Sequence, residues 1–263
     1  GDVVAAPDTL VPTRKAAAWF EHLKNAPRPL KNRTRVRFHA GTSELPGRVV
    51  ILSAPELQPG EAGFVQIVFE TPAVLLPHDR YVLRSYSPVF TIGGGEVLDI
   101  LPPKYKRTSD GLQQGLAILK KGNISEMLQL FCREAGPAGL EFSQMQRRCG
   151  LNAQELQAII DTLLSEKTAV AFNTNPLQIT MPEVIRELEM QITGELKTYH
   201  SQNPLKAGML KEELKVKLPK NTDAKLYSFC IENLEKKGGL TIAKEFLALP
   251  EHKPVLKEGE QGL

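Results

Sequence analysis

The sequence predicts a multidomain protein in which an all-β barrel precedes two small α+β domains. Three observations lead to this prediction. The chain has 263 residues, more than one hydrophobic core usually holds. From Val36 to Leu101, short apolar runs are separated by glycine and proline, as in barrels and sandwiches. After Pro102-Pro103, long amphipathic stretches with few β-branched residues replace them, so helices are expected there.

Five apolar runs in the first part have the length and spacing of strands. They are VRFHAG, GRVVIL, GFVQIVFE, YVLRSY and GGEVLDIL, which begin at residues 36, 47, 63, 81 and 94. The intervening segments 57–63 and 71–80 contain prolines that interrupt a regular strand, so they are predicted to be loops.

Two other segments of the first part carry separate predictions. Gly93-Gly94-Gly95 opens a strand rather than a helix, so it lacks the helix N-terminus of a phosphate cradle and is predicted to form a tight turn. Residues 13–25 are rich in helix formers, and prolines follow them. A short helix or an irregular arm is therefore predicted at 13–25.

The rest of the chain repeats one order of elements, in which three helices precede a hairpin. Residues 123–135, 141–149 and 152–166 are predicted helices, the first and third with asparagine caps. Residues 168–180 alternate apolar and polar around Asn-Pro, which indicates a hairpin. This is the order of a winged-helix domain.

The same order returns about seventy residues later. Helices are predicted at 182–200, 208–214 and 223–237, and TIAKEFLAL at 241–249 is predicted as a hairpin strand. The predicted fold class is therefore a β-barrel followed by two α+β winged-helix domains. The predicted bounds are 1–103 for the barrel, 104–181 and 182–255 for the winged-helix domains, and 256–263 for a tail or linker.

Composition and motifs exclude several functional classes. No apolar run reaches the length of a membrane span, and the first residues lack the features of a secretory signal, so a cytoplasmic location and no membrane partner are predicted. Three scattered cysteines are predicted to be reduced core thiols, and no metal site is expected. No nucleotide loop, zinc-protease helix or nucleophile elbow occurs. His78 and Asp79 are adjacent on a predicted loop and would point in different directions, so no catalytic site is predicted.

Positive charge is concentrated in the first part of the chain. Residues 1–107 contain 14 Lys and Arg against 10 Asp and Glu, whereas residues 108–263 contain 19 against 20. No acidic residue occurs from His22 to Ser43, a segment with six basic side chains. Such a run favours binding to a polyanion, and the alternative is a solvated strand edge.

Four strings in this part carry a family resemblance: VRFHAGT at 36–42, LQPGEAGFVQIVFE at 57–70, DRYVLRSYSP at 79–88 and TIGGGEVLD at 91–99. Together they resemble the third domain of selenocysteine-specific elongation factors (SelB), which is itself similar to the last barrel of elongation factor Tu. The winged-helix repeat that follows is also what the C-terminal extension of SelB contains.

The resemblance implies that the barrel contacts RNA, with arginines supplying charge to phosphates. The alternative is that Asp79 and Arg80 pair with each other and that His39, Thr42 and Thr91 tie loops together. A cluster of lysines in the second predicted winged-helix domain also allows two interpretations. The lysines contact phosphate, or they belong to a charge-balanced helix face. The candidate RNA-binding residues are Arg35, Arg37, His39, Gly41, Thr42, Arg84, Ser85, Tyr86, Ser87, Lys211, Lys215 and Lys217.

The function implied is that of a non-catalytic, RNA-binding portion of a selenocysteine-specific elongation factor. The implied partners are selenocysteinyl-tRNA, the ribosome and, through further winged-helix domains, a messenger recoding hairpin. GTP and Mg²⁺ would act in a GTPase domain outside this chain, so no cofactor is expected here. The alternative from another class is a protein-docking or dimerisation scaffold built on winged helices. Steep salt dependence of binding would indicate RNA rather than protein docking.

Overall fold

The computed structural model describes residues 10–103, 105 and 111–252. These residues divide into two compact units. One lies within residues 1–130 and 143–160, and the other lies within 131–142 and 161–263. This division follows packing, and the domain bounds expected from the sequence stay predictions.

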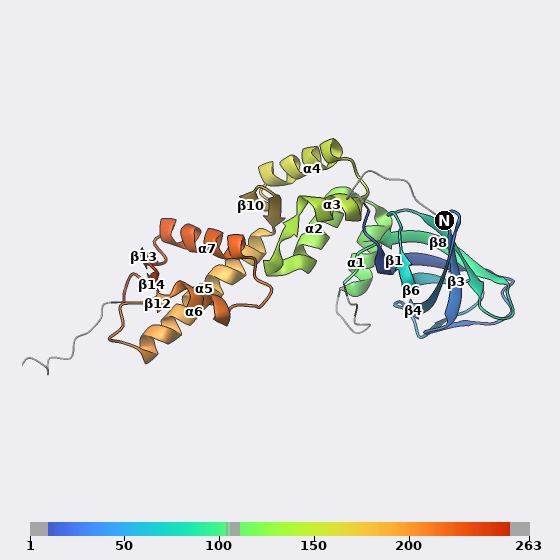
Figure 1. The fold of residues 1–263 in the computed structure, drawn as a ribbon, viewed down its shortest axis with the longest axis horizontal. Helices are drawn as coiled ribbons and strands as arrows, with labels where there is room; N and C mark the ends of the chain where they lie inside the picture. The colour runs from blue at the N-terminus through green and yellow to red at the C-terminus, as the bar shows by residue number, and fades with distance from the viewer. Residues whose placement is uncertain (1–9, 104, 106–110, 253–263) are drawn as a thin grey trace, which may run out of the picture. The chain divides into compact units, whose positions relative to one another are not determined.

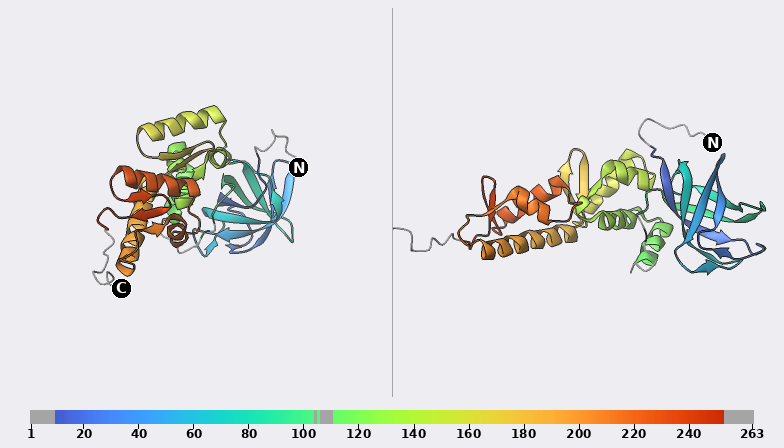
Figure 2. Two further views of the ribbon diagram at one scale, coloured as in Figure 1. Left: turned by 60° about the vertical axis from the view of Figure 1, so that its left-hand side comes forward. Right: turned by 60° about the horizontal axis from the view of Figure 1, so that its bottom comes forward.

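A closed antiparallel barrel forms the larger part of the first unit, and its strands curve around one core (Figures 1 and 2). The order around the barrel is β1, β6, β4, β3, β7 and β8, after which β8 pairs with β1. The short strands β2 and β5 form a separate pair. The bounds are β1 Thr13–His22, β2 Leu30–Lys31, β3 Arg35–Ala40, β4 Ser43–Ile51, β5 Glu56–Leu57, β6 Ala62–Ala73, β7 Arg80–Ser85 and β8 Thr91–Asp99.

Strand alternation decides which side chains fill the barrel. In β3, Val36 and Phe38 are fully buried, whereas Arg35 and Arg37 face outward because successive side chains of a strand point to opposite sides. Phe38 stacks on Tyr81 with ring centroids 4.8 Å apart, and it meets the edge of Phe69 at 5.1 Å. Burial raises the pKa of Tyr81 well above its usual value. The five strands expected between residues 36 and 101 are confirmed.

The prediction for residues 13–25 is wrong, because most of this segment is strand β1. Its alanines favour a helix locally, but pairing with β6 and β8 on both edges determines the conformation. Ala16, Ala17 and Ala18 are fully buried, and small side chains suit a strand in a crowded barrel wall.

The prediction of a tight turn at Gly93-Gly94-Gly95 is also wrong, since the triplet lies inside β8. A Cβ at Gly93 or Gly95 would collide with the backbone carbonyls of Glu21 or Trp19 on β1, and a Cβ at Gly94 would collide with that of Tyr81 on β7. The glycines therefore allow both neighbouring strands to approach β8 closely.

Helices α1 (Leu112–Lys121) and α3 (Phe142–Cys149) belong largely to the barrel's unit. The amide of Gln113 donates to the carbonyl of Leu52 at 2.9 Å, and Nζ of Lys120 lies 3.2 Å from the centroid of the Trp19 ring. Helix α1 was not separately predicted, because its start after residue 110 carries no capping side chain.

The elements after α1 repeat one order twice, as predicted. The first series is α2 Ile124–Ala135, β9 Leu140–Glu141, α3, α4 Ala153–Ser165, β10 Val170–Thr174 and β11 Leu177–Thr180, with the 3-10 turn η1 Gly136–Ala138 before β9. The second is α5 Pro182–Gln202, β12 Met209–Leu210, α6 Lys211–Lys217, α7 Ala224–Lys236, β13 Thr241–Ala243 and β14 Phe246–Ala248. In each, the short early strand pairs with the second hairpin strand, giving the sheets β10-β11-β9 and β13-β14-β12. The fold is a closed barrel followed by winged-helix domains.

The predicted helix caps are present where the sequence places them. Oδ1 of Asn123 accepts from the amide of Glu126 at 3.1 Å, and Oδ1 of Asn152 accepts from Glu155 at 2.9 Å. TIAKEFLAL forms two strands rather than one, because Lys244 takes a positive φ of 57° and turns the chain.

The three cysteines are buried thiols that form no disulfide, as predicted. Burial raises the pKa of both Cys149 and Cys230 to about 12, so their thiols stay protonated at neutral pH. Among the described residues, no helix is long and apolar enough to cross a membrane.

Candidate nucleic-acid interface

Four arginines lie on one outward face of the barrel. Arg35 and Arg37 project from β3, where Arg35 is opposite Arg48 of β4 and Arg37 is opposite Arg84 of β7. Directly opposed residues of paired strands share a face, so the register alone gathers these side chains. Arg35, Arg37, Arg48, Arg84 and the adjacent Tyr86 are called the arginine face below.

The ring of Tyr86 lies against two of these arginines. The guanidinium carbon of Arg35 is 4.0 Å from the ring centroid, and that of Arg37 is 5.0 Å from it. Such contacts hold flexible guanidinium groups in fixed positions at an exposed surface. Tyr86 itself is 38% exposed, so the ring is both a support and an accessible aromatic surface.

Two carboxylates balance part of this positive charge. Glu70 of β6 accepts two hydrogen bonds from Arg35, both at 2.8 Å, and Glu44 of β4 accepts one from Arg37. These bonds lower the pKa of each carboxyl group below its usual value, so both stay ionised at neutral pH. The hydrogen bonds that Arg35 donates to Glu70 also raise the pKa of Arg35.

Four guanidinium groups therefore face two carboxylates, which leaves two positive charges in surplus. Arg48 and Arg84 act on Glu70 and Glu44 only over a distance, through their charges. Surface ion pairs of this kind are weak and exchange readily with another anion. Phosphate groups can therefore replace the carboxylates as partners of these arginines at a small cost in free energy.

The remaining predicted RNA-binding residues of the barrel differ in their exposure. His39 is half-buried with Nε2 3.9 Å from Glu44, and Gly41 and Thr42 form the exposed turn between β3 and β4. Ser87 is exposed, but Ser85 is 5% exposed and its hydroxyl is used inside the turn, bonding to Pro88 and Phe90. We therefore leave Ser85 out of the proposed contact surface.

The predicted lysines lie on α6, a short helix in the other unit. Nζ of Lys217 is 3.6 Å from a carboxylate oxygen of Glu195, whereas Lys211 and Lys215 are half-buried. The first turn of the same helix carries Glu212 and Glu213. The local charge is close to balanced, so this helix is a weaker candidate than the arginine face.

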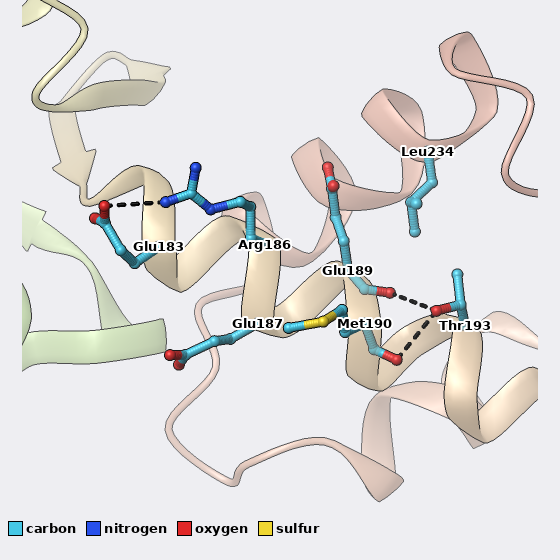
Figure 3. A pocket seen from close by; sticks show the side chains of 7 residues that line it. All are labelled: Glu183, Arg186, Glu187, Glu189, Met190, Thr193 and Leu234. Carbon is cyan, nitrogen blue, oxygen red and sulfur yellow. Dashed lines mark hydrogen bonds and ion pairs between the residues drawn. The ribbon is translucent and has the colours of Figure 1, made fainter.

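A hollow on the second unit has the opposite character. It lies between α5 and α7 and is lined by Glu183, Glu187 and Glu189 against a single arginine, Arg186 (Figure 3). Arg186 turns toward Glu183 with an N–O separation of 3.0 Å, and Met190 is 65% exposed. Its acidic and apolar lining would repel phosphate and suits a protein partner better.

Sequence reasoning did not identify Arg48, Glu44 or Glu70 as parts of the interface. The acid-free run ends at Ser43, and these residues lie on other strands, so only strand register brings them together. The adjacent His78 and Asp79 do not form a catalytic pair. Nδ1 of His78 is 2.6 Å from Glu96, while Asp79 accepts from the amide of Leu76.

Comparison with known proteins finds relatives of both parts of the chain. A family model described as the β-barrel domain of selenocysteine-specific elongation factor matches residues 19–104, and one described as a winged helix of elongation factor SelB matches residues 194–249. The selenocysteine-specific elongation factor of Desulfomicrobium baculatum is 29% identical over the whole chain, which covers 41% of that protein. The Escherichia coli factor is 25% identical over 89% of the chain, covering 36% of its own length.

A solved structure shows the same fold. The crystal structure of a bacterial selenocysteine-specific elongation factor, EF-Sec, matches 93% of this chain and 35% of its own length with a TM-score of 0.65 and 19% identity. The chain thus spans less than half the length of these relatives.

The barrel and winged helices define a class, the translation elongation factors that carry such an extension. Within that class, the chain matches a C-terminal part of the selenocysteine-specific elongation factor (SelB) family. Neither matched domain is catalytic.

Proposed function

We propose that this chain is the RNA-binding, non-catalytic portion of a factor that delivers selenocysteinyl-tRNA to the ribosome at recoded UGA codons. In this proposal the barrel contacts the tRNA, and the winged helices connect the barrel to a reader of the messenger hairpin. GTP and Mg²⁺ would act in another domain of the factor, and the factor would work in the cytoplasm.

The observation that carries the proposal is the arginine face on a barrel of this family. Tyr86 holds Arg35 and Arg37 in place, and the face keeps a surplus of positive charge. Arginine groups fixed in this way bind phosphate with two parallel hydrogen bonds and position an RNA backbone without reading its sequence.

The winged helices support a connecting role. Their charge is close to balanced, and Lys217 is engaged with Glu195. A winged helix that grips nucleic acid usually presents a basic recognition helix. Lys211, Lys215 and Lys217 therefore stay as secondary RNA contacts in this proposal.

The test is binding of the whole chain to selenocysteine-specific tRNA, an ordinary elongator tRNA and a recoding hairpin, each over a salt series. We expect the first to bind tightest, with log affinity falling linearly with log salt. Arg37→Ala and Arg84→Ala should each weaken binding and reduce the salt slope by about one unit.

Arg186→Gln is the matched control, because it removes an exposed arginine from the acidic hollow and should leave tRNA binding unchanged. Binding that ignores salt, or that Arg186→Gln weakens as much as Arg37→Ala does, would contradict the assignment of the barrel as the tRNA-contacting element.

One observation favours the second candidate, a protein-docking scaffold. The hollow between α5 and α7 combines acidic side chains with the exposed Met190. Such a surface suits a basic, partly apolar protein segment. If none of the three RNAs binds, this function replaces the first.

A further inference from the structure

A cavity at one end of the barrel has no assigned role. It measures about 420 Å³, within the range of small-ligand pockets. Arg28 and Lys31 stand on its rim, and no acidic residue is among its described lining residues. The field inside it therefore favours an anionic group.

The walls of this barrel-end pocket are apolar and aromatic. Leu30, Phe90 and Ile92 line it, and the guanidinium carbon of Arg28 lies 5.8 Å from the centroid of the Phe90 ring. A ligand that fits must combine a negative charge with a flat or apolar body. A bare inorganic anion would leave these walls unused.

His22 adds a specific polar group to the pocket. His22 is one of the residues that line the cavity, it is 4% exposed, and its Nδ1 lies 3.2 Å from the carbonyl oxygen of Leu57. Since a carbonyl only accepts, Nδ1 carries the proton and donates it. Nε2 is then a buried acceptor, and it has no partner among the described residues. A buried acceptor left unpaired is costly, so a ligand that donates to it gains affinity.

The pocket adjoins the arginine face along the chain. Thr34 of the pocket precedes Arg35, and Ser85 of the pocket precedes Tyr86. Val36 is paired with Ser85, so both connections lie at the same end of β3 and β7. A strand of RNA that follows the arginine face would pass beside this pocket.

We propose that the barrel-end pocket holds one unpaired nucleotide of the bound RNA. Its phosphate lies at Arg28 and Lys31, its base rests against Phe90 and Ile92, and a hydroxyl or amino group of the nucleotide donates to Nε2 of His22. Proteins commonly recognise unpaired nucleotides by such stacking and edge contacts. This inference rests on the proposed function, because it assumes that RNA occupies the barrel.

The test follows the imidazole nitrogens of His22 by NMR while the whole chain is titrated with adenosine or uridine 5′-monophosphate. We expect a saturable shift of Nε2, because it gains a hydrogen bond. Adenosine without phosphate should bind at least several-fold more weakly, and inorganic phosphate should not shift Nε2. The double variant Arg28→Gln/Lys31→Gln should weaken nucleotide binding about tenfold.

Arg80→Gln is the control, because Arg80 is an exposed barrel arginine outside the pocket and should titrate like the unaltered chain. An unchanged Nε2 resonance with both nucleotides would overturn the proposal. So would an equal shift with inorganic phosphate, which would show a simple anion site.

Binding to selenocysteine-specific tRNA separates this inference from the function on which it rests. If Arg28→Gln/Lys31→Gln binds the tRNA as tightly as the unaltered chain while Arg37→Ala does not, the pocket assignment fails and the proposed function stands. If Arg37→Ala and Arg84→Ala also bind normally, both fail.

Discussion

Arg148 donates two hydrogen bonds to the carboxylate of Asp99, from Nε at 3.2 Å and from Nη2 at 2.6 Å, and both residues are buried. Asp99 ends strand β8 and Arg148 lies on α3, so the pair fastens this helix to the barrel. Oδ1, the oxygen that accepts from Nε, also accepts from the backbone amide of Leu101 at 3.0 Å. Together with Lys120 against Trp19, the pair makes α1, α3 and the barrel parts of one compact unit.

Replacing Arg148 should therefore strongly destabilise the barrel's unit. Arg148→Met leaves the Asp99 carboxylate buried without its cation, and we expect a loss of about 3 to 5 kcal/mol in the free energy of unfolding. Chemical denaturation followed by the fluorescence of Trp19, the only tryptophan, measures the barrel's unit. The double variant Asp99→Asn/Arg148→Met removes both charges and should recover much of the loss. Equal instability of the single and double variants would contradict this account.

Replacing glycine with alanine should have opposite effects on stability at Gly95 and at Gly194. Gly95→Ala places a methyl group against the backbone carbonyl of Trp19, and we expect the barrel to lose about 1 to 3 kcal/mol. Gly194 lies inside α5 with open space around the position of a Cβ, so Gly194→Ala should stabilise the helical unit by roughly 1 kcal/mol. Trp19 fluorescence measures the first change and helical circular dichroism the second. Two changes of the same sign would refute the argument from packing.

How far the sequence predicted the fold depends on whether local pattern or pairing decides each element. The five strands between residues 36 and 101 and the two helices with asparagine caps follow from local pattern, and they are confirmed. Strand β1 and the glycine triplet do not, because their conformation depends on neighbours far along the chain: β6 and β8 for β1, and β1 and β7 for the triplet. The local alanine and glycine content points to the wrong answer in both cases.

The candidate interface shows the same limit. The acid-free run from His22 to Ser43 indicated a positive field, and the structure places Arg35 and Arg37 on an outward face. The two carboxylates that bind them, Glu44 and Glu70, come from β4 and β6, and no sequence pattern reveals that pairing. Which of the candidate residues touch RNA stays a prediction.

Those two carboxylates offer a test in which affinity should rise. Glu44→Gln and Glu70→Gln release Arg37 and Arg35 from their ion pairs and add one positive charge each to the arginine face. If this face binds phosphate, the double variant should bind tRNA several-fold more tightly at low salt and show a steeper salt slope. Glu187→Gln, on the acidic hollow, is the matched control. Unchanged affinity in the double variant would mean that RNA does not reach these arginines.

The second unit should lose stability in mild acid through His200. The residue is 8% exposed, its Nε2 accepts from the amide of Leu249 at 3.2 Å, and its ring stacks on His252 with centroids 3.7 Å apart. Burial, and to a lesser degree the neighbouring His252, lower the pKa of His200 below its usual value near 6.5. The imidazole is thus neutral in the folded unit, with Nε2 free to accept.

Because the folded pKa is depressed, the unfolded chain binds more protons once the pH falls below about 6.5. The stability that His200 contributes is therefore fully present above that pH and declines as the pH falls toward the folded pKa. We expect the protection of the Leu249 amide against hydrogen exchange, and the denaturation midpoint of the helical unit, to fall between pH 7 and pH 5.5. His200→Gln keeps an acceptor that does not titrate, so it should flatten this decline. If the decline persists unchanged in His200→Gln, another group is responsible and the imidazole at this position is only a packing element.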